Sequence, residues 1–295
     1  MVGSAVERLL RARGFRHIIT ADRTKLDLRD QSMVHDFIRD HRPDCVILAA
    51  AKVGGIKANM AQPADFLLEN LLIQNNVIQA SCEFTVKRFV FLGSSCIYPK
   101  ACPQPMKEAH LLTGPLEPTN EGYALAKIAG LKLVQYLHAQ TGFKSVSLMP
   151  CNLYGPNDSF DLEKSHVLSA LVRRFVDAAK GGQVEVVLWG SGKARREFMH
   201  VDDLARAILH FAEDGEHLGI LNVGWGIDVS IQELAARVAD QAGYTGEVKW
   251  DTTKPEGMMR KCMDVTRMKE LGFAPTIELE AGIKQMIDLY RSTQS

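Results

Sequence analysis

The apolar residues of this chain fall into two kinds of segment: short continuous runs, and longer stretches in which they recur at helical spacing. The continuous runs predict buried strands, at residues 17–20, 44–50, 88–92, 145–149, 184–188 and 220–223. The helical spacing predicts helices, at residues 4–13, 31–39, 63–82, 122–139, 166–179, 230–242 and 280–290, with a further helix running through residue 211. Helices that alternate with short strands predict an α/β protein with a doubly wound parallel sheet.

The pattern changes after Pro150. Strands become sparse there, and residues 152–156 are predicted to form a loop. We therefore expect a sheet domain over residues 1–150, to which segments near 198–225 return. A smaller second domain would be made mainly of residues 151–295. Asp202 and Asp203 stand where they could cap the helix that runs through residue 211.

The first residues lack part of the pattern typical of a dinucleotide-binding sheet. Such a sheet opens with a strand and a glycine-rich turn that leads into the first helix. This chain opens with Met-Val-Gly-Ser, so Gly3 would be the last glycine of that turn. The strand and the earlier glycines are missing from the sequence. We therefore expect a neighbouring strand without a partner and an incomplete cradle for a pyrophosphate group.

Composition narrows the function classes. The chain has 295 residues, of which 46% are hydrophobic and 24% charged, as in an ordinary globular protein. Its formal net charge of zero argues against nucleic acid or an anionic membrane as the main partner. No apolar run is long enough to span a bilayer. The six cysteines form no CxxC pair, so we expect no metal site and a reducing, cytoplasmic setting.

The candidate chemistry lies where the strand at residues 88–92 ends. Gly93 permits a turn, and Ser94, Ser95 and Cys96 follow at the edge of the sheet where open α/β folds bind ligands. Tyr123 and Lys127 are one helical turn apart, so the phenol and the ammonium share a helix face. A neighbouring ammonium lowers the pKa of a phenol and makes it useful for proton transfer. We therefore predict one pocket that contains these side chains.

Each candidate also has a purely structural interpretation. Ser94 could hydrogen-bond a substrate oxygen, or it could cap a strand end. Cys96 could abstract a proton next to a ketone as a thiolate, or it could be a packed thiol. His166 could be the partner acid, although a histidine at a helix start is often structural. The pair of Tyr123 and Lys127 could arise by chance, but its place after the Gly-Ser-Ser turn favours function.

Basic residues are common in the second half of the chain. They could clamp phosphate groups or form a solvated surface, and they are Arg173, Arg174, Arg195, Arg196, Arg260 and Lys261. Trp189 could stack on a flat ring or pack in a core. Asp22 and Arg23 follow the predicted strand at residues 17–20. An acid there suits the ribose of NAD and an arginine suits the 2′-phosphate of NADP, so the cofactor stays open, with Arg23 favouring NADP.

Several longer motifs point to one family. They are LAAAKVGGI at 48–56, GSSCIYP at 93–99, PTNExYAxAK at 118–127, PxNLYGP at 150–156, SHV at 165–167, WGSG at 189–192 and REFMHVDD at 196–203. Together they cover essentially the whole chain and closely resemble the GDP-L-fucose synthase family of extended short-chain dehydrogenase/reductases. The YxxxK motif alone would indicate only the superfamily. The cysteine in GSSC, the AAAKVGG segment and SHV are far more specific.

The resemblance implies a Rossmann-type sheet domain that binds NADP(H), a C-terminal substrate domain and two reactions in one pocket. Cys96 would be the base and His166 the acid that epimerise C3 and C5 of GDP-4-keto-6-deoxy-D-mannose. Tyr123 would then protonate the C4 oxygen during hydride transfer. Lys127 would lower the pKa of that tyrosine and hold the nicotinamide ribose, and Ser94 would orient the carbonyl.

The resemblance also implies binding residues. Those that would border the cofactor are Gly3, Arg23, Leu92, Gly93, Ser94, Ser95, Lys127, Pro150, Cys151, Asn152, Leu153 and His166. Those that would bind the GDP-sugar are Arg174, Trp189, Arg196 and Lys261. A homodimer is implied through the helices predicted at 63–82 and 122–139. The alternatives are another nucleotide-sugar enzyme, a 4-epimerase or 4,6-dehydratase, and a truncated, non-catalytic relative that binds a GDP-sugar.

Overall fold

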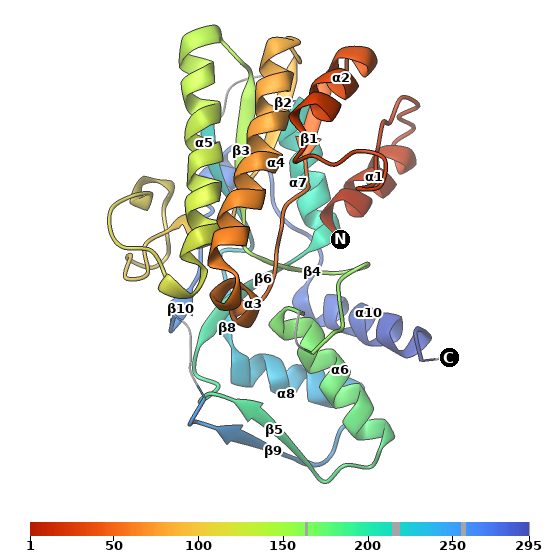
Figure 1. Ribbon diagram of the computed structural model, residues 1–295. Helices are drawn as coiled ribbons and strands as arrows, with labels where there is room; N and C mark the ends of the chain where they lie inside the picture. The colour runs from red at the N-terminus through yellow and green to blue at the C-terminus, as the bar shows by residue number, and fades with distance from the viewer. Residues whose placement is uncertain (163–164, 214–218, 255–257, 295) are drawn as a thin grey trace.

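The computed structural model of the protein describes residues 1–162, 165–213, 219–254 and 258–294 (Figure 1). A sheet with helices on both faces forms one part, and a group of helices and short strands below it in Figure 1 forms the other. Among the described residues, none of the helices is both long enough and apolar enough to cross a membrane.

The first part is built on four parallel strands in the order β1-β2-β3-β7. They are β1 (Cys45–Leu48), β2 (Arg88–Leu92), β3 (Ser145–Pro150) and β7 (Gly219–Val223). The helices of this part are α1 (Val2–Ala12), α2 (Gln31–His41), α3 (Ile56–Ala61), α4 (Pro63–Glu83), α5 (Glu121–Thr141), α7 (Val201–Glu213) and α9 (Thr266–Glu270). Short 3-10 turns lie at Ser95–Ile97, Glu108–His110 and Pro118–Asn120.

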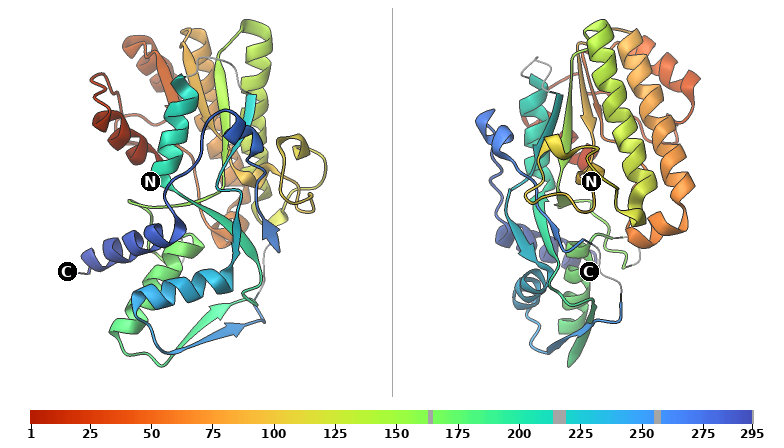
Figure 2. Two further views of the ribbon diagram at one scale, coloured as in Figure 1. Left: turned by 180° about the vertical axis from the view of Figure 1, so that it is seen from behind. Right: turned by 90° about the vertical axis from the view of Figure 1, so that its left-hand side faces the viewer.

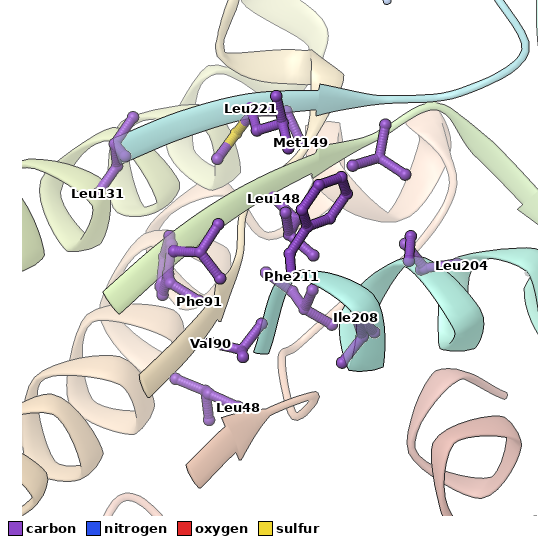
Figure 3. Close-up of a cluster of buried hydrophobic side chains, with 14 of the residues drawn as sticks. Leu48, Val90, Phe91, Leu131, Leu148, Met149, Leu204, Ile208, Phe211 and Leu221 are labelled. Carbon is purple, nitrogen blue, oxygen red and sulfur yellow. The ribbon is translucent and has the colours of Figure 1, made fainter. Parts of the chain in front are cut away.

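Helices cover the two faces of this sheet in pairs. Helices α4 and α5 pack side by side on one face, with α2 against α4, while α7 and α1 cover the other face (Figure 2). Strand β2 is buried along its whole length, which explains its continuous apolar sequence. Figure 3 shows Val90, Leu148 and Phe211 between the sheet and α7. This core fixes the strand ends that carry the site.

The second part has its own apolar core between three helices and the short strands. Its strands are β4 (Asn152–Tyr154), β5 (Glu185–Trp189), β6 (Arg195–His200), β8 (Asp228–Ser230), β9 (Glu247–Asp251) and β10 (Arg260–Lys261). Its helices are α6 (Val167–Lys180), α8 (Ile231–Ala242) and α10 (Leu279–Ser292). Strand β6 lies between β10 and β4, in parallel with both, and β8 pairs with it in the antiparallel sense. Strands β5 and β9 form a separate parallel pair.

Three predictions about local structure were wrong. Residues 17–20 form no strand, because no strand in the described residues lies beside them to supply hydrogen bonds. The predicted loop at 152–156 contains β4, which pairs with β6. Asp203 does not cap its own helix. Its carboxylate instead accepts hydrogen bonds from the backbone N–H groups of Thr276, at 3.0 Å, and Ile277, at 2.8 Å.

The outer edge of β1 has no strand partner within the described residues. Cys45 at its start is exposed, and Val46 and Ile47 are only partly buried. A cavity of about 990 Å³ lies beside this edge, bordered by α1, α7 and residues 15–20. An edge strand of this kind presents a row of backbone N–H and C=O groups that no neighbouring strand pairs with.

Candidate active site

The carboxyl ends of the sheet strands face the second part of the molecule (Figure 1). Strand β2 ends at Leu92, and Gly93 and Ser94 continue from it. A Cβ atom at Gly93 would lie 2.3 Å from the sulfur of Met149 on β3, so a larger residue would fit there only if the end of the methionine side chain moved. The chain then enters the 3-10 turn at Ser95–Ile97, and the Ser94 hydroxyl accepts a hydrogen bond from the Cys96 N–H at 3.2 Å.

These strand ends open onto a pocket of about 480 Å³. The pocket is lined by residues at the carboxyl ends of β1, β2 and β3, by residues of α1 and α5, and by Lys261 of β10. The predicted residues that line it are Gly3, Leu92, Gly93, Ser94, Ser95, Cys96, Tyr123, Lys127, Pro150, Cys151, Asn152, Leu153, His166 and Lys261. The structure therefore brings together all five predicted catalytic side chains and most of the predicted cofactor residues.

Lys127 is only 3% exposed, and its ammonium donates a hydrogen bond to the Leu92 carbonyl at 2.8 Å. It lies over the rings of Phe91, at 5.1 Å, and Tyr123, at 5.9 Å from the centroid. Burial lowers the pKa of Lys127 to about 8. The pocket therefore holds a lysine whose charge is costly to keep and easily influenced by a ligand.

The pKa of Tyr123 differs from the sequence-based expectation. Burial raises the pKa of this phenol above its ordinary value, the nearby Cys96 raises it further, and a hydrogen bond with Ser94 lowers it in part. The predicted lowering by Lys127 is not seen in this ligand-free state, because the loss of water around the ring outweighs an ammonium at this distance. Tyr123 is therefore a protonated phenol, suited to donate a proton.

The sulfur of Cys96 lies among hydrogen-bond donors. The Lys261 ammonium is 3.3 Å away and the Asn120 side-chain amide is 3.1 Å away. Burial by itself raises the pKa of this thiol, but the charge of Lys261 and hydrogen bonds from Ser94, Lys261 and Asn120 outweigh it, so the pKa lies below its ordinary value. A thiol with a lowered pKa is a usable base near neutral pH.

His166 is exposed, lines the same pocket and stands at the N-cap position of α6. Its side chain makes no capping hydrogen bond to the helix. His166 therefore does not stabilise the start of α6 by capping it, which was the structural role considered for it. The ring is available to a ligand in the pocket.

Four predicted binding residues do not line this pocket. Arg23 lies in an exposed turn, with its guanidinium 4.0 Å from Glu69. Arg174 on α6 donates to the carbonyl of Val187 at 3.1 Å. Trp189 is 62% exposed at the end of β5. Arg196 lies on β6, directly opposite Lys261 on β10. The last three lie in the second part, where a larger ligand would extend.

Sequence reasoning missed Asn120, which lines the pocket, and Glu197, whose backbone carbonyl accepts a hydrogen bond from the pocket residue Asn152 at 2.8 Å. Asn120 contacts the Cys96 sulfur, and its own Oδ1 atom is buried without a partner among the described residues. Its place in the PTNExY motif is a signal that could have identified it. Glu197 is 1% exposed and accepts hydrogen bonds from Gly226 N at 2.7 Å and Met263 N at 2.9 Å. Burial raises the pKa of this carboxyl to about 7. Glu197 thereby joins β6 to the segment after β10.

The donor set in the pocket fits a dinucleotide. Met1, Val2 and Gly3 line it, so the first turn of α1 presents backbone N–H groups that have no partner within the helix. A Cβ atom at Gly3 would come no closer than 3.7 Å to Ala49, so the surrounding protein leaves space beside this residue. The buried Oδ1 of Asn59 has no partner among the described residues and also borders the pocket.

The burial of Lys127 leads to a prediction about stability. The pKa of Lys127 falls from its ordinary value of 10.5 to about 8 in the fold. Burial of the charged ammonium therefore destabilises the folded state by about 3 kcal/mol. Loss of the bond to Leu92 offsets about 1 kcal/mol. We expect Lys127→Met to raise the free energy of unfolding of the ligand-free protein at pH 7 by about 2 kcal/mol in urea denaturation.

The pH dependence of that gain follows from the same lowered pKa. Below pH 8 the folded and unfolded states both carry the charged lysine, so the gain is complete. Between pH 8 and pH 10.5 the folded wild type loses its proton first, and the gain shrinks. Lys132→Met, at a half-buried position on the same helix, is the matched control and should change stability by less than about 0.5 kcal/mol. A Lys127→Met protein less stable than wild type at pH 7 would contradict the prediction.

Comparison with known proteins shows which family this sequence resembles. A family model described as the NAD dependent epimerase/dehydratase family matches residues 1–224. The chain is 50% identical over 290 residues to GDP-L-fucose synthase 1 of Arabidopsis thaliana, covering 98% of this chain and 90% of that protein. It is 47% identical over 303 residues to the GDP-L-fucose synthase of Escherichia coli strain K12, covering 100% and 94%.

Solved structures give the same picture. The fold is similar to that of a GDP-mannoheptose C4 reductase from Campylobacter jejuni with NADP bound. The TM-score is 0.91 at 35% sequence identity, over 98% of this chain and 95% of that one.

Proposed function

Because this chain belongs to the NAD dependent epimerase/dehydratase family, we propose that it converts GDP-4-keto-6-deoxy-D-mannose to GDP-L-fucose, with NADPH as the reductant. One observation carries this proposal: a cysteine with a lowered pKa lies in the same pocket as the tyrosine and lysine of a reductase. A plain reductase has no need of that cysteine.

The cysteine serves the first reaction, epimerisation. The 4-ketone of the substrate acidifies the C–H bonds at C3 and C5. Cys96 removes each proton as a thiolate, and His166 returns a proton to the opposite face of the ring. The converging donors around the sulfur support the first role. The pocket position of His166 and its lack of a capping bond support the second.

The second reaction reduces the epimerised ketone. NADPH, when bound, supplies the hydride to C4. Tyr123 donates the proton to the C4 oxygen, a role supported by its raised pKa. The Ser94 hydroxyl orients that oxygen, and the ammonium of Lys127 stabilises the phenolate as it forms. Epimerisation precedes reduction, because reduction removes the ketone that makes the C–H bonds acidic.

The cofactor would be held by the residues at the strand ends. The first turn of α1 with Gly3, the backbone at 92–95 and residues 150–153 would border it, with His166 at the nicotinamide end and Lys127 at the ribose. Arg23 would bind the 2′-phosphate, since its guanidinium is exposed and its contact with Glu69 is long. These assignments divide the chain into a dinucleotide-binding domain over residues 1–150, with 198–225 returning to it, and a mainly substrate-binding domain over 151–295.

The nucleotide half of the substrate would extend into the second domain. Arg174 and Arg196 would contact the diphosphate and Trp189 would stack on a ring of the ligand, which its exposed face permits. We also infer a cytoplasmic location. The six cysteines are all free, as expected in a reducing compartment.

We infer a homodimer through α4 and α5, which lie side by side on one face of the sheet (Figure 2). Leu68 and Tyr136, 58% and 61% exposed, are among the large apolar side chains that these helices present to solvent. Exposed apolar surface of this kind marks an interface. We expect the wild type to sediment as a dimer and Leu68→Glu with Leu125→Glu to sediment as a monomer. Val184→Glu, at an 82% exposed position in the second part, is the control. A monomeric wild type would refute the inference.

The proposed activity is tested with purified protein, NADPH and the 4-keto sugar. We expect stoichiometric oxidation of NADPH and formation of GDP-L-fucose. Product with the substrate's own C3 and C5 configuration would indicate a plain reductase. Turnover of a 4-hydroxy or 4,6-hydroxy sugar nucleotide without net NADPH oxidation would indicate a 4-epimerase or a dehydratase. Binding of GDP without any turnover would indicate a non-catalytic binding protein.

A further inference from the structure

Lys261 and Cys96 meet across the interface of the two parts of the molecule. The ammonium comes from β10 in the second part, and the sulfur from the turn after β2 in the first. The distance between Nζ and Sγ is 3.3 Å. Within the described residues, no ion pair joins Lys261 to a carboxylate. The sulfur is thus the polar group that this half-buried ammonium contacts.

A second hydrogen-bond donor, the side chain of Asn120, favours the thiolate form of Cys96. The side-chain N–H of Asn120 points at the same sulfur from 3.1 Å. A side-chain amide nitrogen and an ammonium can only donate hydrogen bonds, so both need the sulfur as an acceptor. A thiolate accepts such bonds far better than a thiol does. Tyr123 also faces the sulfur, and its buried phenol is protonated. His166 and Lys127 line the same pocket.

The backbone around Lys261 is held on both sides, so its position is not a result of chance. Lys261 pairs with Arg196 in the parallel register of β10 and β6. The next residue donates its N–H to the side chain of Gln104 at 3.0 Å and accepts from the N–H of Met106 at 2.8 Å. Met263 donates to the buried carboxylate of Glu197 at 2.9 Å.

The pairing with Arg196 also carries an electrostatic argument. Lys261 and Arg196 occupy paired positions on neighbouring parallel strands, so two cationic side chains start from the same place in the sheet. A nearby anion lowers the electrostatic cost of bringing two cations together. A substrate diphosphate could supply that anion when bound, but in the free protein the Cys96 sulfur is the group within reach of Lys261.

We propose that Lys261 is a positioning residue that keeps the side chain of Cys96 in its thiolate form, instead of being a ligand of the substrate diphosphate. Its importance for proton abstraction rests on the function proposed above, but the ion pair itself does not. The pair can therefore be tested by a reaction that needs neither substrate nor cofactor.

The test is alkylation of Cys96 by iodoacetamide as a function of pH, followed for each cysteine peptide by mass spectrometry. The thiolate displaces iodide, so a carbon–sulfur bond forms as the carbon–iodine bond breaks, and the rate follows the thiolate fraction. Lys261→Met should move the midpoint of the Cys96 rate profile upward by about one pH unit, and lower the rate at pH 7 about tenfold. Lys261→Arg should stay close to wild type.

Controls separate a local charge effect from general disruption. Lys284→Met, at an exposed position on α10, should leave the Cys96 profile unchanged. Cys82, half-buried on α4 and outside the pocket, provides an internal reference thiol in every sample. Equal shifts in Lys261→Met and Lys261→Arg would reduce Lys261 to a structural role and overturn the proposal. An unchanged Cys96 profile in Lys261→Met would also overturn the proposal. Weakened GDP binding in that variant would then identify Lys261 as a diphosphate ligand. A protein without turnover but with the expected profile would refute only the proposed function.

Discussion

Replacement of Tyr123 with phenylalanine should abolish NADPH oxidation while leaving exchange of the C3 and C5 protons with solvent intact. In the proposed mechanism the phenol supplies the proton that the C4 oxygen must receive as hydride arrives. Its burial keeps it protonated in the ligand-free site. Loss of a positioned general acid typically costs 10²- to 10⁴-fold, so we expect a fall in the reduction rate of about a thousandfold. The sulfur of Cys96 and its donors are untouched by this change.

The measurement combines two signals from one sample. NADPH absorbance reports reduction, and deuterium incorporation from heavy water into recovered substrate reports epimerisation. Tyr136→Phe, at an exposed position on the same helix, is the matched control and should behave as wild type in both. Tyr123 would lose its assigned role if the Phe variant oxidised NADPH within tenfold of the wild-type rate.

Cys96→Ser should slow proton exchange at C3 and C5 and leave hydride transfer intact, which is the reverse of the effect expected for Tyr123→Phe. A serine hydroxyl has nearly the same size as a thiol but is not ionised near neutral pH, so the donors from Lys261 and Asn120 no longer stabilise an available base. We expect proton exchange at C3 and C5 to fall by at least about a hundredfold. Hydride transfer to a ketone that has already been epimerised should continue, since Tyr123, Lys127 and Ser94 remain in place.

Deuterium exchange of the 4-keto sugar, without NADPH, measures the first effect directly. Reduction of the pre-epimerised ketone measures the second. Cys82→Ser on α4 is the control, because that half-buried thiol lies 3.7 Å from the hydroxyl of Thr141 and does not line the pocket. Unchanged exchange in Cys96→Ser would remove this cysteine from the mechanism and leave a plain reductase.

Much of the sheet and the centre of the site could be predicted from the sequence, because their signals are local. Strand β2 was predicted with the bounds that it has, since it is buried along its whole length and reads as a continuous apolar run. Tyr123 and Lys127 lie on one helix, where spacing alone places them on one face. The helix predicted at residues 230–242 forms as α8, and Ser230 caps it in a capping box with Glu233. Comparisons with relatives confirm the family.

What could not be predicted depends on contacts between distant segments. Strand β4 is three residues long, and it is a strand because it pairs with β6, which lies far along the chain. Asp203 has the sequence position of a helix cap, but its carboxylate binds the backbone of Thr276 and Ile277. The raised pKa of Tyr123 reflects burial by segments that spacing does not reveal. Lys261 contacts the sulfur of Cys96 from far along the chain, and spacing in the sequence does not reveal that contact.

The contact between Lys261 and Cys96 also bears on the chemical lifetime of the enzyme. Thiolates are oxidised to sulfenic acid far more readily than thiols are. Here the sulfur belongs to one part of the molecule and the ammonium to the other. Because the contact needs neither substrate nor cofactor, the thiolate would persist between turnovers, when an oxidant can enter the pocket. Storage under oxidising conditions should therefore oxidise Cys96 faster in the free wild-type protein, and so inactivate it faster, than in Lys261→Met.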